Sequence, residues 1–206
     1  MSSKIIEDVY HAFRRVPQPR KVVGCTHCCI SEAELKSLST DVKSAPIKAV
    51  QRLAHNGITT VGNESDYKYF LPRILHEMYL DDDFFFLCMD AFTTRIKRSG
   101  FDEWSDTERK ATLVSLQLIF EKYCGSFDTV WLEDWLYGIA LVDFNVSALL
   151  EILDKPENEL QKLKLVLDCL PFAKRKANGD VRLSHGYLSA KQYQPIQDWL
   201  DVNSPK

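Results

Sequence analysis

The sequence has no apolar run that approaches the roughly 20 residues needed to cross a bilayer. Its start, Met1-Ser2-Ser3-Lys4, leads into an amphipathic stretch and not into the uninterrupted apolar core of a signal peptide. Glycine and proline are also scarce, with 8 of each among 206 residues, which argues against a collagenous or low-complexity chain. We therefore expect a globular protein, and the expected location is cytoplasmic.

Sequence motifs of the common enzyme classes are lacking as well. No Gly-x-Ser-x-Gly elbow, phosphate-binding glycine loop or His-Glu-x-x-His helix occurs. A catalytic pair could be drawn between His27 and a neighbouring cysteine, but no orienting partner or oxyanion-hole motif accompanies it. Asp81, Asp82 and Asp83 are adjacent and so lack the spacing of an acid and a base. The sequence therefore predicts a protein that is not an enzyme.

The chain does contain enough apolar material for one well-buried domain, since hydrophobic residues make up 45% and charged residues 27% of it. Apolar positions recur at helical spacing through most of its length. This pattern predicts an all-α fold of about ten helices, arranged as a single irregular bundle or as a curved stack of helix pairs. We expect one domain over 1–206, with a subdivision near 80 into a cysteine-containing part (1–80) and a helical part (81–206) as the alternative.

Capping residues and prolines mark the expected helix limits. Pro46 suits the first position of a helix that ends at Asn56-Gly57, where glycine would supply the left-handed residue. Asp66 can cap the next helix, and Pro72 opens or kinks its continuation. Two capping boxes are expected, at Ser31 with Glu34 and at Ser105 with Glu108. Other helices are predicted over 5–13, 83–98, 128–141, 145–153, 156–170 and 189–200.

Only two short segments favour extended structure. Asn178-Gly179 could turn one short hairpin near 174–183. The segment 58–61 is β-branched but too short for a sheet of its own.

The net charge of −3 conceals an uneven distribution along the chain. Between Asp81 and Glu159 we count 17 acidic against 7 basic residues, whereas the rest has 12 acidic against 19 basic. An acidic stretch disfavours direct nucleic-acid binding and suits a basic protein partner. Alternatively, these charges only solvate helix faces. Short basic runs leave RNA binding as a third interpretation, which the pI near 6.0 opposes. They contain Arg14, Arg15, Arg20, Lys21, Lys174, Arg175 and Lys176.

The six cysteines are too few and too unevenly placed for a disulfide scaffold, so reduced thiols or a metal cluster are expected. Cys25 and Cys28 have the two-residue gap that lets two thiolates share a zinc ion, and His27 or Cys29 could supply a third ligand. A closed tetrahedral site needs a fourth ligand, which a remote histidine or cysteine would have to provide. Alternatively, Cys28 and Cys29 pack as small hydrophobes before the helix that Ser31 begins.

Several of these motifs together resemble a known family. The residues Cys25-x-x-Cys28-Cys29 followed by Ser31, and later Thr60-Val61-Gly62 and 70–75, are similar to a poorly characterised family of bacterial all-helical proteins over roughly the first third of the chain. The chain also looks like an immunity protein of a contact-dependent growth inhibition system, specifically one that neutralises a nuclease toxin domain. This resemblance implies a protein that acts by binding, and it assigns no contact residue.

We therefore expect an immunity or antitoxin-like protein that binds a basic nuclease toxin domain and occludes its active-site cleft. Trp104 is the expected aromatic anchor, unless it stabilises the start of its own helix. The expected acidic contacts are Asp81, Asp82, Asp83, Asp102, Glu103 and Asp106. The alternative is a zinc- or thiol-dependent protein, an enzyme or a sensor, built on the cluster from Cys25 to Cys29. The first hypothesis needs no cofactor, whereas the second implies zinc.

Overall fold

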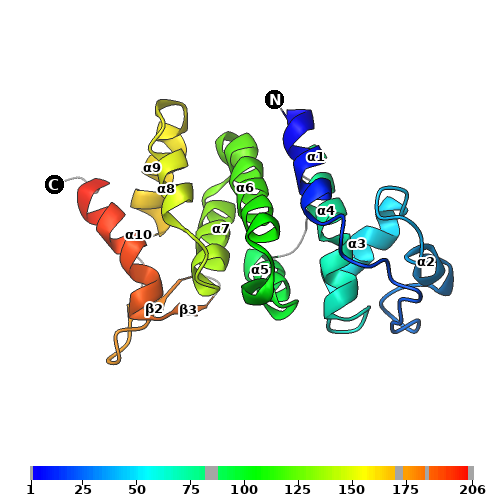
Figure 1. Cartoon of the computed structure of the whole chain (residues 1–206). Helices are drawn as coiled ribbons and strands as arrows, with labels where there is room; N and C mark the ends of the chain where they lie inside the picture. Colours follow the sequence, from blue (N-terminus) through cyan, green and yellow to red (C-terminus); the bar gives the residue numbers. More distant parts are fainter. Residues whose placement is uncertain (1, 82–87, 170–173, 184–185, 204–206) are drawn as a thin grey trace. The chain divides into compact units, whose positions relative to one another are not determined.

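The computed structural model describes residues 2–81, 88–169, 174–183 and 186–203. Ten α-helices lie within these ranges, with one small antiparallel sheet, so the predicted all-α fold with a short hairpin is confirmed (Figure 1). The helices are α1 (Ser2–Ala12), α2 (Glu32–Ser37), α3 (Ile47–Asn56), α4 (Glu64–Leu80), α5 (Met89–Arg98), α6 (Asp106–Tyr123), α7 (Thr129–Leu141), α8 (Ser147–Leu153), α9 (Glu159–Lys164) and α10 (Ala190–Asn203).

Short 3₁₀ and π segments and strands complete the elements. The 3₁₀ turns are η2 (Phe101–Glu103), η3 (Cys124–Ser126) and η4 (Pro156–Asn158), and η5 (Leu165–Cys169) is a π-helix. The predicted helix over 156–170 is thus divided into η4, α9 and η5 in its described part. The strands are β1 (Lys174–Arg175), β2 (Val181–Arg182) and β3 (Tyr187–Leu188), and β3 adds a third strand to the predicted hairpin.

The chain divides into two compact units. Unit 1 comprises Met1–Leu87 and Arg95–Leu118, and unit 2 comprises Cys88–Thr94 and Ile119–Lys206. Where the sequence suggested one domain or a division near 80, the structure groups the start of α6 with α1 to α4 and groups the start of α5 with α7 to α10. The helix predicted over 83–98 is described only from Met89 onward, because residues 82–87 lie outside the described ranges.

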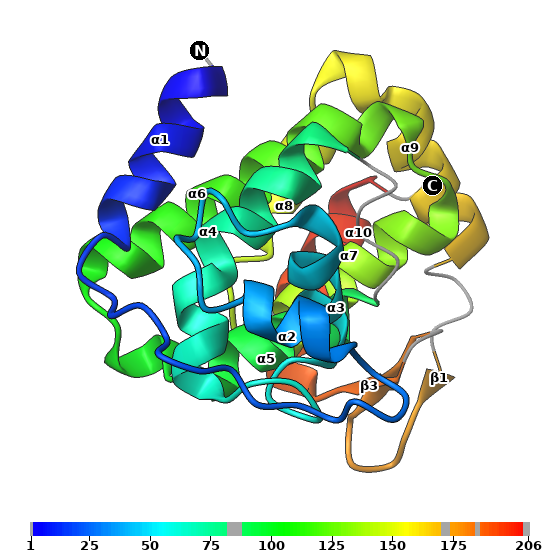
Figure 2. The ribbon, with the colours of Figure 1, turned by 90° about the vertical axis from the view of Figure 1, so that its right-hand side faces the viewer.

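In unit 1, α4 packs against α1 and α3, and α2 packs against α3 (Figure 2). The contact face of α4 is fully buried at Tyr67, Phe70 and Ile74. Pro72 does not open this helix, because α4 begins at Glu64 and continues through the proline. The large apolar residues of one helical face therefore form the core of unit 1.

Three capping boxes fix helix starts in unit 1. The Ser31 and Ser105 boxes have the predicted hydrogen bonds to and from Glu34 and Glu108. The third box was not predicted: Asp66 was expected as the cap of α4, but the N-cap is Asn63 and Asp66 is the N3 residue that bonds back to it. Either residue can cap a helix by its chemistry, and the position of the first turn decides between them.

The prediction of a left-handed glycine after α3 is wrong. Gly57 has φ −56°, and the left-handed residue is Ile58 with φ 66°. Glycine is required at position 57 for space, because a Cβ atom there would lie 2.4 Å from Cδ2 of Tyr67. The turn therefore lets α4 approach α3 closely.

In unit 2, α7 is the most buried helix. Its Gly138 allows close approach to the start of α5, since a Cβ atom at this position would lie 2.5 Å from the carbonyl carbon of Met89. The Thr93 hydroxyl donates to the Gly138 carbonyl oxygen at 2.7 Å, and the Met89 amide donates to Asp134 at 2.8 Å. Asp134 of α7 thus caps α5 from another helix.

Candidate metal centre and acidic surface

The cysteine cluster lies on a loop that is attached to the connection between α3 and α4. The Cys25 amide donates to the Thr60 carbonyl at 2.8 Å, and the Gly62 amide donates to the Val23 carbonyl at 2.7 Å. Gly24 and Val61 form an isolated β-bridge between these two hydrogen bonds. The β-branched segment 58–61, predicted to be too short for a sheet, therefore supplies one short pairing that fixes the start of the cysteine loop.

Beyond Cys25 the chain turns back on itself and enters α2. The amides of Cys29 and Ile30 both donate to the Cys25 carbonyl, at 3.2 and 3.3 Å. Ile30 is buried and Ser31 then begins α2 with its capping box. The turn is thus held at both ends, by the bridge before it and by the helix after it.

This turn brings three sulfur atoms together. The Sγ atoms of Cys25 and Cys28 are 3.7 Å apart, those of Cys28 and Cys29 are 3.2 Å apart, and all three lie within 4.8 Å of one another. Cys28 is exposed, and Cys25 and Cys29 are half-buried. The alternative in which both cysteines pack as small hydrophobes before α2 is therefore wrong for Cys28, whereas Cys29 is partly buried there.

The backbone of the turn favours a thiolate at its first cysteine. The amides of His27 and Cys28 donate to the Cys25 sulfur, which lowers the pKa of that thiol. Hydrogen bonding to the sulfurs of Cys29 and Cys25 raises the pKa of Cys28 to about 11. The pKa values of these two neighbouring thiols are thus shifted in opposite directions.

The histidines do not join the three sulfurs. Within the described residues, the group of candidate ligands here consists of Cys25, Cys28 and Cys29 alone. His27, predicted as a candidate ligand, is exposed and contributes its backbone amide instead. In unit 1, His76 pairs through Nδ1 with the Tyr10 hydroxyl at 3.0 Å, and the His55 carbonyl accepts from Arg95 at 2.7 Å.

A second group of potential metal ligands lies in unit 2, and no spacing in the sequence indicates it. The ligand atoms here belong to Cys88, Asp90 and Asp134 and lie within 4.8 Å of one another. Asp134 is distant in sequence, since it accepts a hydrogen bond from the amide of Met89, 45 residues away. Burial, and then the charges of Asp134 and Asp90, raise the pKa of the Cys88 thiol. Because Asp134 is buried and caps α5, the structure already explains why its carboxylate is there.

The predicted acidic contact residues are exposed where they are described. These residues are Asp81, Asp102, Glu103 and Asp106, whereas Asp82 and Asp83 lie outside the described residues. Asp102 pairs with Lys97 at 2.7 Å, and Asp106 pairs with Arg109. Neighbouring cations therefore partly neutralise two of these carboxylates.

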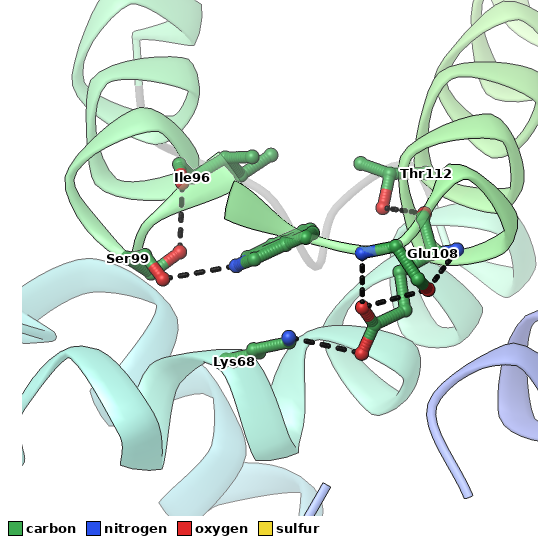
Figure 3. A network of polar contacts seen from close by, with 7 residues as sticks. Lys68, Ile96, Ser99, Glu108 and Thr112 are labelled. Carbon is green, nitrogen blue, oxygen red and sulfur yellow. Dashed lines mark hydrogen bonds and ion pairs between the residues drawn. The ribbon is translucent and has the colours of Figure 1, made fainter. Parts of the chain in front are cut away.

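Trp104 is not available as a surface anchor, because only 4% of it is exposed. Its indole N–H donates to the Ser99 carbonyl at 3.0 Å, and its ring meets Phe13 edge to face at a centroid distance of 5.4 Å. Nζ of Lys68 lies 5.0 Å from the ring centroid and pairs with Glu108 at 2.9 Å (Figure 3). These contacts fit the second interpretation, in which Trp104 packs against the region where α6 begins.

Glu108 connects this aromatic cluster to the helix cap. Its carboxylate accepts from the Ser105 amide and hydroxyl at 2.8 and 2.9 Å, and Figure 3 shows it between Lys68 and the start of α6. Burial raises the pKa of Glu108, but the hydrogen bonds from Lys68 and Ser105 outweigh it and lower the pKa overall. The buried carboxylate is thus kept charged by its partners.

The acidic stretch of the sequence is divided between the units. Counted over its whole extent, unit 1 has 16 basic and 15 acidic residues, whereas unit 2 has 10 basic and 14 acidic residues. The predicted contact residues therefore lie in the unit that is close to neutral. Unit 2 also carries Trp131, 37% exposed at the start of α7 beside the N-cap Asp128, which the sequence analysis did not select.

Comparisons with protein-family models, with curated proteins and with solved structures find no match. In the described part of the chain, no helix has the length and apolar character of a membrane span.

Proposed function

We propose that this protein binds a thiophilic metal ion through Cys25, Cys28 and Cys29. The observation that carries the proposal is the convergence of three sulfurs, all within 4.8 Å of one another, on a turn that backbone hydrogen bonds hold. Thiolates are the ligands that zinc and copper(I) prefer, and one ion could contact all three sulfurs after small movements. The function that sequence reasoning ranked second thus has the stronger geometric support.

The first test is the amount of metal bound by the full-length protein under anaerobic conditions. The reduced protein should retain one zinc or copper(I) ion per chain after gel filtration. Cys25→Ser, Cys28→Ser and Cys29→Ser should each abolish stoichiometric retention, because each removes one of three ligands. Cys124→Ala is the control, since it removes a thiol that lies in neither group of candidate ligands. Wild-type protein that retains no metal would refute the proposal.

Metal removal should leave the fold intact. The three cysteines lie on a loop, whereas the core of unit 1 is made by helices whose buried faces do not include them. A strong chelator should therefore leave the far-ultraviolet circular dichroism signal of the helices largely unchanged. Loss of most of that signal would show that the ion supplies folding free energy, as it does in zinc fingers.

A second proposed function is inhibition of a basic partner, most concretely a nuclease toxin domain that acts in the cytoplasm. The net charge of unit 2, with 14 acidic and 10 basic residues, supports this proposal. An acidic surface would attract a cationic nuclease cleft and exclude nucleic acid from it. In this function the protein acts by binding and catalyses no reaction.

Charge reversal at two places tests this second proposal. Glu151, Glu157 and Glu159 of unit 2 are exposed, and changing all three to lysine should slow association with a toxin domain encoded beside the gene by about tenfold or more at low salt. The matched set in unit 1, Asp102→Lys with Glu103→Lys and Asp106→Lys, should have a smaller effect because unit 1 is close to neutral.

Association rates measured at several salt concentrations decide the outcome, with circular dichroism as a check on folding. The difference between variants should shrink as salt screens exposed charges. If both variants associate equally slowly, the predicted contact residues of unit 1 belong to the interface as well. If neither association rate changes, the proposal of an acidic interface is wrong.

A further inference from the structure

From the number and type of converging donors, we propose that Cys25, Cys28 and Cys29 form a three-coordinate, all-sulfur centre for copper(I). This inference rests on the proposed metal-binding function and specifies which ion the site takes. Its basis is that three donors, all of them thiols, converge among the described residues.

The donor count favours copper(I) over structural zinc. Structural zinc is almost always bound by four ligands in a tetrahedron, and a catalytic zinc completes its shell with water. Copper(I) is a softer ion that thiolates select, and three sulfurs can satisfy it without an oxygen or nitrogen ligand. His27, the nearest candidate for a fourth donor in the sequence, is exposed and lies outside the group.

The spacing of the sulfurs is compatible with one shared ion. With metal–sulfur bonds of about 2.3 Å, three sulfurs arranged in a plane around the ion would lie about 4.0 Å apart. Two of the observed distances, 3.7 and 3.2 Å, are shorter than this value and the third is no more than 4.8 Å, so small side-chain movements would bring all three sulfurs around one ion. Cys28 and Cys29 are consecutive, so their Cα atoms are about 3.8 Å apart and their side chains can meet at one point without moving the backbone.

The surroundings can tolerate the resulting charge. Three thiolates and one copper(I) ion carry a net charge of −2, which would be costly in a dry core. Here Cys28 is exposed and its two partners are half-buried, so water can solvate the complex. The amides of His27 and Cys28 already donate to the Cys25 sulfur and would stabilise it as a ligand.

The experiment loads the reduced full-length protein with copper(I) or with zinc under anaerobic conditions and measures X-ray absorption at each metal edge. We expect one copper(I) ion per chain with three sulfur ligands and no nitrogen or oxygen ligand. Competition with a chromophoric copper(I) chelator should show that each Cys→Ser variant of the cluster loses more than about 100-fold in affinity, which exceeds the loss typical of changing a residue that only supports a ligand. His27→Ala and Cys124→Ala should bind as the wild type does.

The outcomes distinguish the copper(I) centre from metal binding in general. A nitrogen ligand that disappears in His27→Ala, or multinuclear copper clusters together with four-coordinate zinc, would overturn the copper(I) centre and leave metal binding in place. Failure to retain either ion in a cysteine-dependent way would overturn both. Circular dichroism of each variant establishes that the loss comes from the ligand and not from unfolding.

Discussion

Gly138→Ala should destabilise the protein by about 2–4 kcal/mol, although alanine is intrinsically the better helix former by about 1 kcal/mol. The added Cβ atom would lie 2.5 Å from the Met89 carbonyl carbon and 2.7 Å from the Asp90 amide nitrogen. Both are backbone atoms, so no side-chain rotation relieves the overlap, and α5 must move away from α7. That movement would also lengthen the hydrogen bond from Thr93 to the Gly138 carbonyl.

Urea denaturation of the full chain, followed by circular dichroism, measures this effect. Gly125→Ala is the matched control, because a Cβ atom at Gly125 meets nothing within 4 Å. The control should change stability by less than about 0.5 kcal/mol. If both variants unfold at the same urea concentration as the wild type, the close approach of α5 to α7 is wrong.

Trp104→Ala should cost about 3–5 kcal/mol of stability, the range for truncating a buried large aromatic side chain. The change removes the edge-to-face contact with Phe13 and the hydrogen bond to Ser99, and it opens a cavity beside Lys68. The pair between Lys68 and Glu108 would then be more exposed to water and contribute less.

Trp131→Ala is the matched control for the same residue type, because 37% of Trp131 is exposed. We expect it to cost about 1 kcal/mol in the same urea titration. Trp104→Phe should fall between the two, since it keeps an aromatic ring and loses the indole N–H. A Trp104→Ala variant as stable as Trp131→Ala would mean that Trp104 lies on the surface, as an interface anchor would require.

Features that depend on neighbouring residues were predictable from the sequence. A capping box needs two residues three positions apart, so Ser31 and Ser105 could be identified without knowing the fold. The grouping of the three cysteines could also be recognised, because their spacing of three and one residues permits a tight turn that brings the sulfurs together. Whether His27 joins them depends on the direction of its side chain in that turn, which spacing does not determine.

Features that depend on distant contacts were not predictable. Trp104 stands among acidic residues in the sequence, and its burial requires Phe13 from α1 and Lys68 from α4. Gly57 was recognised as a helix end, but its role is to make room for Tyr67, a contact between helices. The acidic stretch of the sequence likewise does not belong to one unit, because the fold distributes its residues over two.

The β-bridge between Gly24 and Val61 has a consequence for the order of events during synthesis. The two residues are 37 positions apart, so the three thiols leave the ribosome well before the segment that fixes their loop. Closing a loop of this length carries an entropic cost that the packing of α3 must offset. Until then the thiols belong to a mobile chain and are open to oxidation. A newly made molecule is therefore most open to thiol oxidation before α3 and the following turn have folded.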